Sequence, residues 1–463
     1  METDRRFVLG AALTLACPRS AVAAPVRIFT PEEFGAKGDG RTNDSLAFGR
    51  LANAVNMYGG GTVSFRKTTY LVGLQGLAPN DFYLFPPRDL LTFKGCHSPL
   101  LLEGNGARIL CETGLRFGVF GLDGLPSHHP MPYTGPGLAS PYKAMISVEN
   151  CTAAVQVSDF DLEGCTDDLI IGGQYGDVGW QIPAYGLLLR DNLGSEVIER
   201  IRSHSHPLDG IGIIGPDKPT AAAVRTLIDV IADRNGRQGC SLTSGHDYAF
   251  KRCNFTRTGR GKISSAPGAG IDIEAEDRLI RHISFEDCHF ADNAGCGMVA
   301  DSGDSADIRF DRCVFVGTTS WSAWPRKPGM RFIACKFVGA IANAFGNPDP
   351  SRAAQFYRCT FDNNPALSST GKVYGGSNTD RPLADLSSEI NVLFDQCKFS
   401  ALHRGSLPWS TGAIYRDCTM VAGFDITSHT RGHFLGYNTI VGKVDLSGSK
   451  IVGAVMLNGK LLH

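Results

Sequence analysis

The sequence lacks the features by which nucleic-acid-binding and membrane proteins are usually recognised. It carries 45 Lys and Arg against 46 Asp and Glu, for a net charge of -1, and the basic residues form no block. A chain with this balance has no electrostatic reason to bind a polyanion or an anionic bilayer. Beyond the first residues, no apolar run is long enough to span a bilayer. We therefore expect no nucleic-acid partner and no membrane span.

Paired-cysteine metal motifs are also missing. The chain has 14 Cys but no Cys-x-x-Cys, the usual beginning of a zinc site. Half of the cysteines instead share one position of an internal repeat, in which an aromatic residue lies three residues before the Cys and an apolar residue two after it. They are Cys253, Cys288, Cys313, Cys335, Cys359, Cys397 and Cys418. A constant repeat position favours small buried hydrophobes with free thiols over disulfide partners.

The repeat has the period of a solenoid coil. Successive cysteines are 35, 25, 22, 24, 38 and 21 residues apart, which fits a coil of low-twenties length with insertions in its loops. Such short strands cannot bury an apolar face alone, whereas coils stacked roughly 4.8 Å apart form a continuous core. The pattern therefore predicts an all-β, single-stranded parallel β-helix.

The first 23 residues have the character of an export signal. Arg5 and Arg6 precede the apolar stretch 7–16, and Ala21-Val22-Ala23 offers small residues for cleavage. The two arginines resemble a twin-arginine signal, which exports folded proteins; an ordinary secretion signal with two chance arginines is the alternative. Either one predicts a periplasmic or secreted protein.

The residues after the signal are expected to close one end of the solenoid. Residues 24–75 form an N-terminal cap and the first coil in this interpretation, and residues 76–463 form the β-helix, with long loops at 78–145. Asp44 or Ser45 can cap an amphipathic helix over Leu46–Tyr58, which Gly59-Gly60-Gly61 ends. A helix here can cover an edge that would otherwise seed aggregation.

The run from Phe34 to Gly73 resembles the start of the pectate lyase and rhamnogalacturonase-like superfamily. The resemblance implies a right-handed parallel β-helix that acts on polysaccharides. It leaves the reaction open, because hydrolases, lyases, epimerases and phage tailspikes share the fold. The Gly-His-Gly of the polygalacturonases and the vWiDH-type pattern of the classical pectate lyases are absent, so no catalytic residues are carried over.

A second register is anchored on glycines 186, 210, 239, 270 and 297, which lie 24, 29, 31 and 27 residues apart. Strands aligned in this way should stack as one sheet. Strand alternation then turns Asp272 and Glu274 outward, with Asp301 beside them on the next coil. We therefore expect these three acids to form a carboxylate cluster on an outer wall, and we take them as the candidate catalytic residues.

Such a cluster has three interpretations. Two carboxyl groups can act as general acid and base in glycoside hydrolysis. Alternatively they can hold Ca²⁺, the one cofactor that the sequence suggests, for β-elimination from a uronate polymer. The base in elimination would come from Arg237, Lys262, His204 or His206. The third interpretation is a solvated acidic face. Hydrolysis is slightly favoured, because acids outnumber obvious bases in the cluster.

Further side chains are expected to bind substrate. Trp321 and Trp324 follow the cluster by one coil and offer rings on which the C–H face of a pyranose can pack. The full set of candidates is Arg190, His204, His206, Asp209, Arg237, Trp321 and Trp324. The sequence thus predicts an exported polysaccharide-cleaving enzyme, monomeric or homotrimeric. A lyase, a C5-epimerase and a non-catalytic glycan-binding or structural β-helix are the alternatives.

Overall fold

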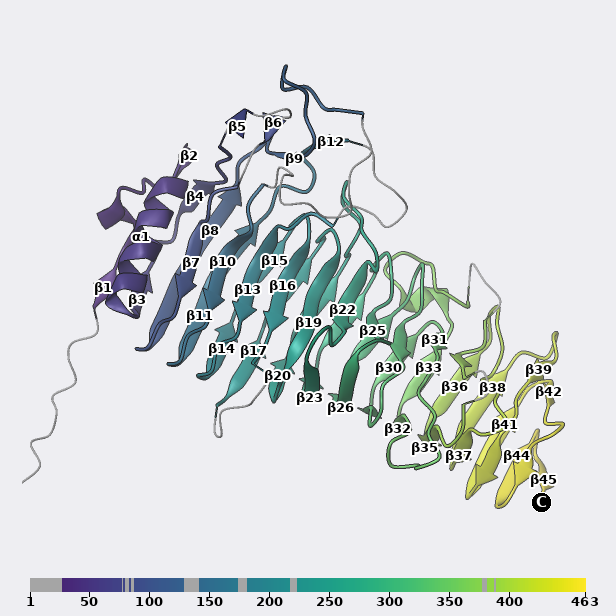
Figure 1. Cartoon of the computed structure of the whole chain (residues 1–463). Helices are drawn as coiled ribbons and strands as arrows, with labels where there is room; N and C mark the ends of the chain where they lie inside the picture. The colour runs from purple at the N-terminus through teal and green to yellow at the C-terminus, as the bar shows by residue number, and fades with distance from the viewer. Residues whose placement is uncertain are drawn as a thin grey trace, which may run out of the picture.

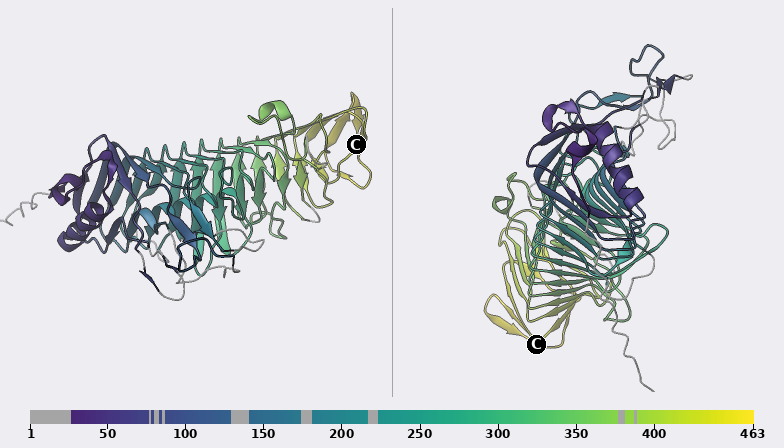
Figure 2. Two further views of the ribbon diagram at one scale, coloured as in Figure 1. Left: turned by 90° about the horizontal axis from the view of Figure 1, so that it is seen from above. Right: turned by 90° about the vertical axis from the view of Figure 1, so that its left-hand side faces the viewer.

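The computed structural model describes residues 27–463, with gaps at 77, 80–82, 85–86, 129–140, 174–180, 217–222, 377–380 and 387–388. The expected export signal at residues 1–23 lies outside the described residues. Within them, the chain winds into one long stack of parallel strands with an α-helix at its N-terminal end (Figure 1). Seen from above, the coils follow one another along a single axis (Figure 2). The predicted right-handed parallel β-helix is confirmed, in agreement with the resemblance of residues 34–73.

A typical coil contributes three strands, and each strand pairs in parallel with its counterpart on the next coil, which creates three faces. Sheet 1 consists of β7 (Leu91–Lys94), β10 (Ala144–Glu149), β13 (Tyr185–Arg190), β16 (Asp209–Ile214), β19 (Gln238–His246), β22 (Ala269–Ile273), β25 (Met298–Ala300), β28 (Ala323–Pro325), β31 (Ile341–Ala342) and β34 (Ala384–Asp385).

Sheet 2 begins with β1 (Ile28–Phe29), β3 (Gly61–Ser64) and the first halves of β8 (Leu100–Cys111) and β11 (Val155–Glu163). It continues through β14 (Glu196–Glu199), β17 (Arg225–Ile228), β20 (Tyr248–Lys251), β23 (Leu279–Glu286), β26 (Asp304–Asp311), β29 (Arg331–Ile333), β32 (Gln355–Tyr357), β35 (Leu393–Asp395), β37 (Ile414–Arg416), β40 (His433–Leu435) and β43 (Lys450–Ile451).

Sheet 3 begins with β2 (Asp39–Asn43), β4 (Thr69–Val72) and the second halves of β8 and β11. It continues through β15 (Arg202–His204), β18 (Ile231–Asp233), β21 (Asn254–Thr256), β24 (His289–Ala291), β27 (Val314–Val316), β30 (Lys336–Val338), β33 (Thr360–Asp362), β36 (Lys398–Ala401), β38 (Thr419–Ala422), β41 (Tyr437–Val441) and β44 (Ala454–Leu457), on which β45 (Lys460–Leu462) folds back antiparallel.

The remaining elements lie outside the three sheets. They are α1 (Ser45–Tyr58), the 3-10 turns η1 (Pro31–Phe34) and η2 (Pro365–Leu367), and the strand pairs β5 (Ala78–Pro79) with β6 (Tyr83–Leu84), β9 (Arg116–Gly118) with β12 (Ile170–Gly172), and β39 (Ser428–His429) with β42 (Val444–Asp445). No helix in the described ranges combines the length and the apolar character needed to cross a membrane.

Stacked aromatic rings fill the core between sheets 2 and 3. Like residues of successive coils lie directly above one another, as the repeat predicted: Phe290 and Phe315 stack at 4.9 Å between ring centroids, and so do Phe315 and Phe337. All three rings are fully buried. Because each ring is packed between two others, a missing one would leave a cavity that its neighbours cannot fill, at a cost of about 3–5 kcal/mol.

Left-handed residues make the corner between sheets 2 and 3. The residue before each repeat cysteine has a positive φ, close to 50° at Arg252, Asp287, Arg312, Ala334 and Arg358. Ion pairs join neighbouring corners, with Arg252 Nε 2.7 Å from Asp229 and Arg312 Nε 2.8 Å from Asp287. The cysteines that follow point inward, and all 13 cysteines of the described chain are buried free thiols. The prediction of free thiols is confirmed for these residues.

The capping helix occupies the end of the stack, with Phe48, Leu51 and Val55 fully buried against the first coils. It begins at Ser45 and ends at Tyr58, and the next residue, Gly59, supplies the left-handed stop with a φ of 85°. Asp44 precedes the helix without capping it, because its carboxylate accepts hydrogen bonds from the backbone of Lys37 and Gly38.

One part of the predicted organisation is corrected. Residues 78–145 were expected to be long loops, yet β7 and β8 fall inside this range and form regular walls of the helix. These strands carry neither the Phe-Cys repeat nor the glycine register, so the sequence offered no alignment that would place them.

Candidate active site

The glycine-anchored register is present in sheet 1. Cys240 pairs with Ile271 and Ile271 with Met298, and all three side chains point into the core. In the same ladders Ser241 pairs with Asp272 and Asp272 with Val299, so Asp272 faces outward. Asp272, Glu274 and Asp301 line one hollow of about 290 Å³. The structure thus brings together the three predicted carboxyl groups.

Asp272 is the most enclosed of the three acids. Only 5% of its surface is exposed, and Gln181, Ala266 and Pro267 from two loops line the same hollow. Burial, reinforced by the charge of Glu274, raises the pKa of Asp272 to about 8, although the nearby Arg237 acts in the opposite direction. This carboxyl group therefore keeps its proton at neutral pH.

Gln238 holds the Asp272 carboxyl from the preceding coil. Its Nε2 donates a hydrogen bond of 2.6 Å to Oδ2 of Asp272, and Gln238 is itself 3% exposed. The other amide atom, Oε1, is buried and meets no hydrogen-bond partner among the described residues. Rotation of the amide by half a turn would let this oxygen accept the proton of a neutral Asp272. Gln238 can thus orient the carboxyl group in both ionisation states.

Glu274 and Asp301 lie nearer to solvent. Ser302 Oγ donates to Glu274 Oε1 at 2.6 Å, and Asp301 is exposed. Lys327 lies close to both acids, with its Nζ 2.8 Å from the carbonyl of Gly303. Burial lowers the pKa of Lys327. The hollow thus combines one protonated acid with two more accessible carboxyl groups and a nearby cation.

Arg237 and Asp209 form a buried pair behind the hollow. Arg237 donates to both carboxylate oxygens of Asp209, at 2.9 and 2.5 Å, and its Nη1 donates to Gln181. Asp209 is 0% exposed, so the prediction that it touches substrate is wrong. Its place is to anchor Arg237, and the charge of Asp209 raises the pKa of Arg237 despite the burial of the guanidinium.

The two predicted tryptophans lie beside the carboxylates on the following coil. Trp324 pairs with Val299, which in turn pairs with Asp272. Both Trp321 and Trp324 pack on a small apolar cluster that includes Val299. The indole N–H of Trp324 is buried and finds no acceptor in the described part of the chain. Their position fits contact with a chain lying over Asp272; the contact itself remains a prediction.

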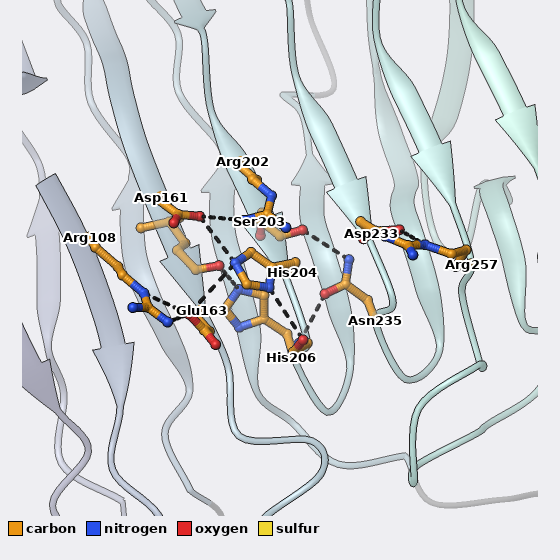
Figure 3. Close-up of polar contacts among 12 residues, drawn as sticks. Arg108, Asp161, Glu163, Arg202, Ser203, His204, His206, Asp233, Asn235 and Arg257 are labelled. Atoms are coloured by element: carbon orange, nitrogen blue, oxygen red, sulfur yellow. Dashed lines mark hydrogen bonds and ion pairs between the residues drawn. The ribbon is translucent and has the colours of Figure 1, made fainter. Parts of the chain in front are cut away.

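His204 and His206 are not part of this site. His204 lies on sheet 3, where its Nε2 is 3.1 Å from Asp161 and 3.9 Å from Glu163 (Figure 3). His206 points into the interior and is 0% exposed. Its Nδ1 is 2.7 Å from the hydroxyl of Tyr142, and burial lowers its pKa to about 3. The prediction that His206 contacts substrate is therefore wrong. His204 is separated from the carboxylates by a corner of the solenoid.

Arg190 lies on the outward face of sheet 1, as predicted, but several coils before the acids. It pairs with Ile214 of β16, and its Nε is buried with no hydrogen-bond partner in the described ranges. The ring of Tyr185, on the same strand as Arg190, reaches the next coil: a Cβ on Gly212 would come within 2.8 Å of it. Glycine at position 212 thus leaves room for that ring.

The residues present do not fit the Ca²⁺ site that elimination would use. Among the described residues no three His, Cys, Asp or Glu side chains converge so as to hold a metal ion. In the polar run 301–307, Ser302 donates to Glu274 and Asp304 pairs with Arg281 at 2.6 Å. Residues 301–303 are a bend that leads into β26, and the rest of the run is the start of that strand.

Sequence reasoning missed Gln238, which holds the Asp272 carboxyl, and the loop residues Gln181, Ala266 and Pro267, which line the hollow. Gln238 precedes an aligned glycine and could have been found by comparing it with Asp209 on the coil before. Gln181 and Pro267 come from loops outside the repeats, for which the sequence holds no positional signal.

Comparison with known proteins gives limited matches. No family model matches the sequence. A segment of 89 residues is 38% identical to depolymerase 1 of Klebsiella phage KN3-1, named as specific for capsule KN3. The segment is 19% of this chain, and the match spans only 10% of the depolymerase.

Solved structures resemble the chain over most of its length. The A-module of mannuronan C-5 epimerase AlgE4 of Azotobacter vinelandii is 14% identical over 92% of this chain and 100% of its own, with a TM-score of 0.43. Tailspike protein gp49 of Pseudomonas phage LKA1 is 11% identical over 93% and 78%, with a TM-score of 0.41. At such identities and scores the likeness carries no argument about chemistry.

Proposed function

We propose that this protein is a glycoside hydrolase that cleaves a polysaccharide lying across the outward face of sheet 1, with Asp272 as the general acid. The observation that carries the proposal is the enclosed Asp272 carboxyl, which keeps its proton with a pKa of about 8 beside two more accessible acids. Glycoside hydrolysis needs this division between a protonated and an ionised carboxyl group.

The reaction follows from these two states. Asp272 donates its proton to the glycosidic oxygen as the bond from that oxygen to the anomeric carbon breaks. Glu274 or Asp301 then acts on the anomeric carbon in one of two ways. It can remove a proton from an attacking water, which inverts the anomeric centre, or attack directly, which retains it after a second step with water.

Backbone spacing leaves both partners in reach. Residues two apart on a strand lie about 7 Å apart, and neighbouring coils about 4.8 Å. Glu274 is two residues along the chain from Asp272, and Asp301 is one coil and two residues away, a diagonal of about 8 Å between Cα atoms. The stereochemistry of the product identifies the pathway.

The bases that elimination would call upon are engaged elsewhere. Arg237 is paired with Asp209, His206 is enclosed in the core, and His204 belongs to sheet 3. Lys262 donates from its Nζ to the carbonyl of Leu169 at 3.1 Å. These contacts count against elimination through any of these four bases.

The partial match to a capsule-specific depolymerase supports a polysaccharide as the substrate. A capsular or exopolysaccharide would meet this protein outside the cytoplasm, which agrees with the export signal predicted at residues 1–23.

The proposal is tested by product analysis. Wild-type protein and the variants Asp272→Asn, Glu274→Gln and Asp301→Asn are incubated with acidic and neutral polysaccharides, with new reducing ends and ultraviolet absorbance followed together. The matched control is Asp229→Asn, because Asp229 lies in an exposed corner with a left-handed φ of 55° that Asn tolerates.

We expect new reducing ends without near-ultraviolet absorbance, loss of turnover in Asp272→Asn and in at least one of the other two variants, and normal turnover in Asp229→Asn. An unsaturated product that absorbs in the near ultraviolet would show that the reaction is elimination and not hydrolysis. Full turnover by Asp272→Asn would show that the general acid is misassigned.

A further inference from the structure

The outward row that contains Asp272 continues toward the C-terminal coils and ends at an exposed tryptophan. Asp272 pairs with Val299 and Val299 with Trp324. Ala323 pairs with Ile341, which brings Ala342 beside Trp324, and Ala342 pairs with Asp385. A bridge then joins Asp385 to Trp409. We call this set the Asp272 row: Asp272, Val299, Trp324, Ala342, Asp385 and Trp409.

All members of the Asp272 row lie on the same side of the wall. The residues before four of them along the strands, Met298, Ala323, Ile341 and Ala384, belong to the buried core. Strand alternation therefore turns the row itself outward. Five coil steps separate Asp272 from Trp409, roughly 24 Å at about 4.8 Å per step.

This geometry matches a linear glycan. One pyranose unit advances along an extended chain by about as much as one coil advances along the solenoid axis. A glycan running parallel to the row, outside the parts of the chain that bury Val299 and Ala342, would thus advance by about one sugar per coil and bring one of its units to the exposed Trp409.

Trp409 is an exposed ring with a cation beside it. It is 46% exposed, the only tryptophan in the described chain among the large exposed hydrophobic residues. The Arg431 guanidinium lies 5.8 Å from its ring centroid, while the backbone carbonyl of Arg431 accepts a hydrogen bond from Ser410. An exposed ring can take the C–H face of a sugar, and an adjacent guanidinium can pair with its carboxylate or another acidic substituent.

The same pair of residue types occurs nearer to the carboxylates. Arg381 lies 5.4 Å from the centroid of Trp321, which also contacts Tyr374 at 4.9 Å. Two arginine-on-tryptophan pairs on the C-terminal side of one acid cluster favour a ligand that carries acidic groups at intervals.

We infer that Trp409 and Arg431 form a distal subsite for an acidic sugar unit of a glycan that extends along the Asp272 row. The ligand class is an anionic polysaccharide, with uronate units as the simplest example. The position of the cleaved bond at Asp272 rests on the proposed function; the subsite itself does not.

Binding is measured with the full chain carrying Asp272→Asn, which prevents turnover. The probes are alginate, polygalacturonate and hyaluronan, with dextran as the neutral polymer, and oligosaccharides of increasing length from each acidic polymer. Trp409→Ala and Arg431→Gln are introduced into this background. Phe424→Ala is the matched control, because Phe424 is a 65% exposed aromatic of the C-terminal coils that lies outside the row.

We expect at least one acidic polymer to bind, and Trp409→Ala to weaken that binding about tenfold, the loss of one stacking contact. Oligosaccharides too short to reach five coils beyond Asp272 should bind parent and variant equally. Arg431→Gln should weaken binding of the acidic polymer and make that binding less dependent on salt concentration. Phe424→Ala should change nothing.

Equal binding of long chains by the parent, Trp409→Ala and Arg431→Gln overturns the subsite. Preferential binding of dextran overturns the assigned charge. Binding that depends on Trp409, in a protein whose wild type cleaves none of the polymers that it binds, supports the subsite and contradicts the proposed hydrolysis. The two proposals therefore fail separately.

Discussion

Replacing Asp272 by Asn is expected to stabilise the fold while it removes activity, and the stabilisation should grow with pH. The pKa of Asp272 in the folded protein is about 8, against an ordinary value of 3.8. Between these two values the folded protein holds a proton that the unfolded chain has released. The contribution of the Asp272 carboxyl to the free energy of unfolding is therefore largest below about pH 4, and it is lost as the pH rises toward 8. Asparagine never ionises, so the variant escapes the loss.

The magnitude follows from the size of the shift. One pKa unit corresponds to about 1.4 kcal/mol, so the wild type loses roughly 4 kcal/mol relative to the variant between pH 5 and pH 8. The unfolding entropy is about 2 cal/mol/K per residue, which for 463 residues gives roughly 1 kcal/mol per degree. The difference in Tm between variant and wild type should therefore widen by about 4 °C over this range.

The assay is differential scanning calorimetry of both proteins at several pH values. Comparison at each pH cancels the titration of every other group. Asp229→Asn serves as the control, because the hydrogen bond from Arg252 lowers the pKa of Asp229 below its ordinary value of 3.8. Its contribution to stability changes only in more acidic solution, so the gap between this variant and wild type should stay constant from pH 5 to pH 8. If the gap between Asp272→Asn and wild type stays constant from pH 5 to pH 8, Asp272 is an ordinary ionised acid and the proposed proton donor is lost.

Four more outcomes are expected. The kcat/KM of the wild type should fall as the pH rises through about 8, where Asp272 gives up its proton; a profile that stays flat to pH 10 would exclude it as the acid. Gln238→Leu should lower kcat about tenfold with little change in KM and move the alkaline limb of the pH profile upward, since a hydrogen bond to the ionised carboxyl is lost; an unaltered profile would make Gln238 merely structural. Phe315→Ala should cost about 3–5 kcal/mol in denaturant unfolding, because this ring is stacked between Phe290 and Phe337; a cost under 1 kcal/mol would contradict the packing. A thiol reagent should leave the 13 described cysteines unmodified in the folded protein and reach them all after denaturation, since each is buried and free.

The register of the solenoid was predictable because a β-helix makes alignment within one chain equivalent to contact in space. Once the glycines at 239, 270 and 297 are aligned, Asp272 must lie beside position 299, and Asp301 must follow close by. The Phe-Cys repeat placed the core in the same way, ring over ring.

The enclosure of the site was beyond such alignment. Asp272 shares its hollow with Gln181 and Pro267, which come from loops that carry no periodic signal. A strand register says that a side chain points outward, but not which loop residues will stand beside it.

His206 shows a second limit. Strict alternation would leave it near the surface, yet Ser205 adopts a left-handed φ of 58° at the end of β15. This reversal turns the next side chain into the interior, where it meets Tyr142. The pattern of polar residues in His204-Ser205-His206 contains no sign of the reversal.

The left-handed corner between sheets 2 and 3 also offers a place to make the protein more robust at a distance from its carboxylates. Most of its residues offset the backbone cost, about 1 kcal/mol, with a charge or an amide. Ala334, with φ 52°, brings neither, and its neighbours in the column are Arg312 and Arg358. An aspartate at this position would tolerate the conformation better and would stand between two cations. The column of charge that now breaks at Ala334 would then continue from Arg312 to Arg358, and such networks gain importance as temperature rises.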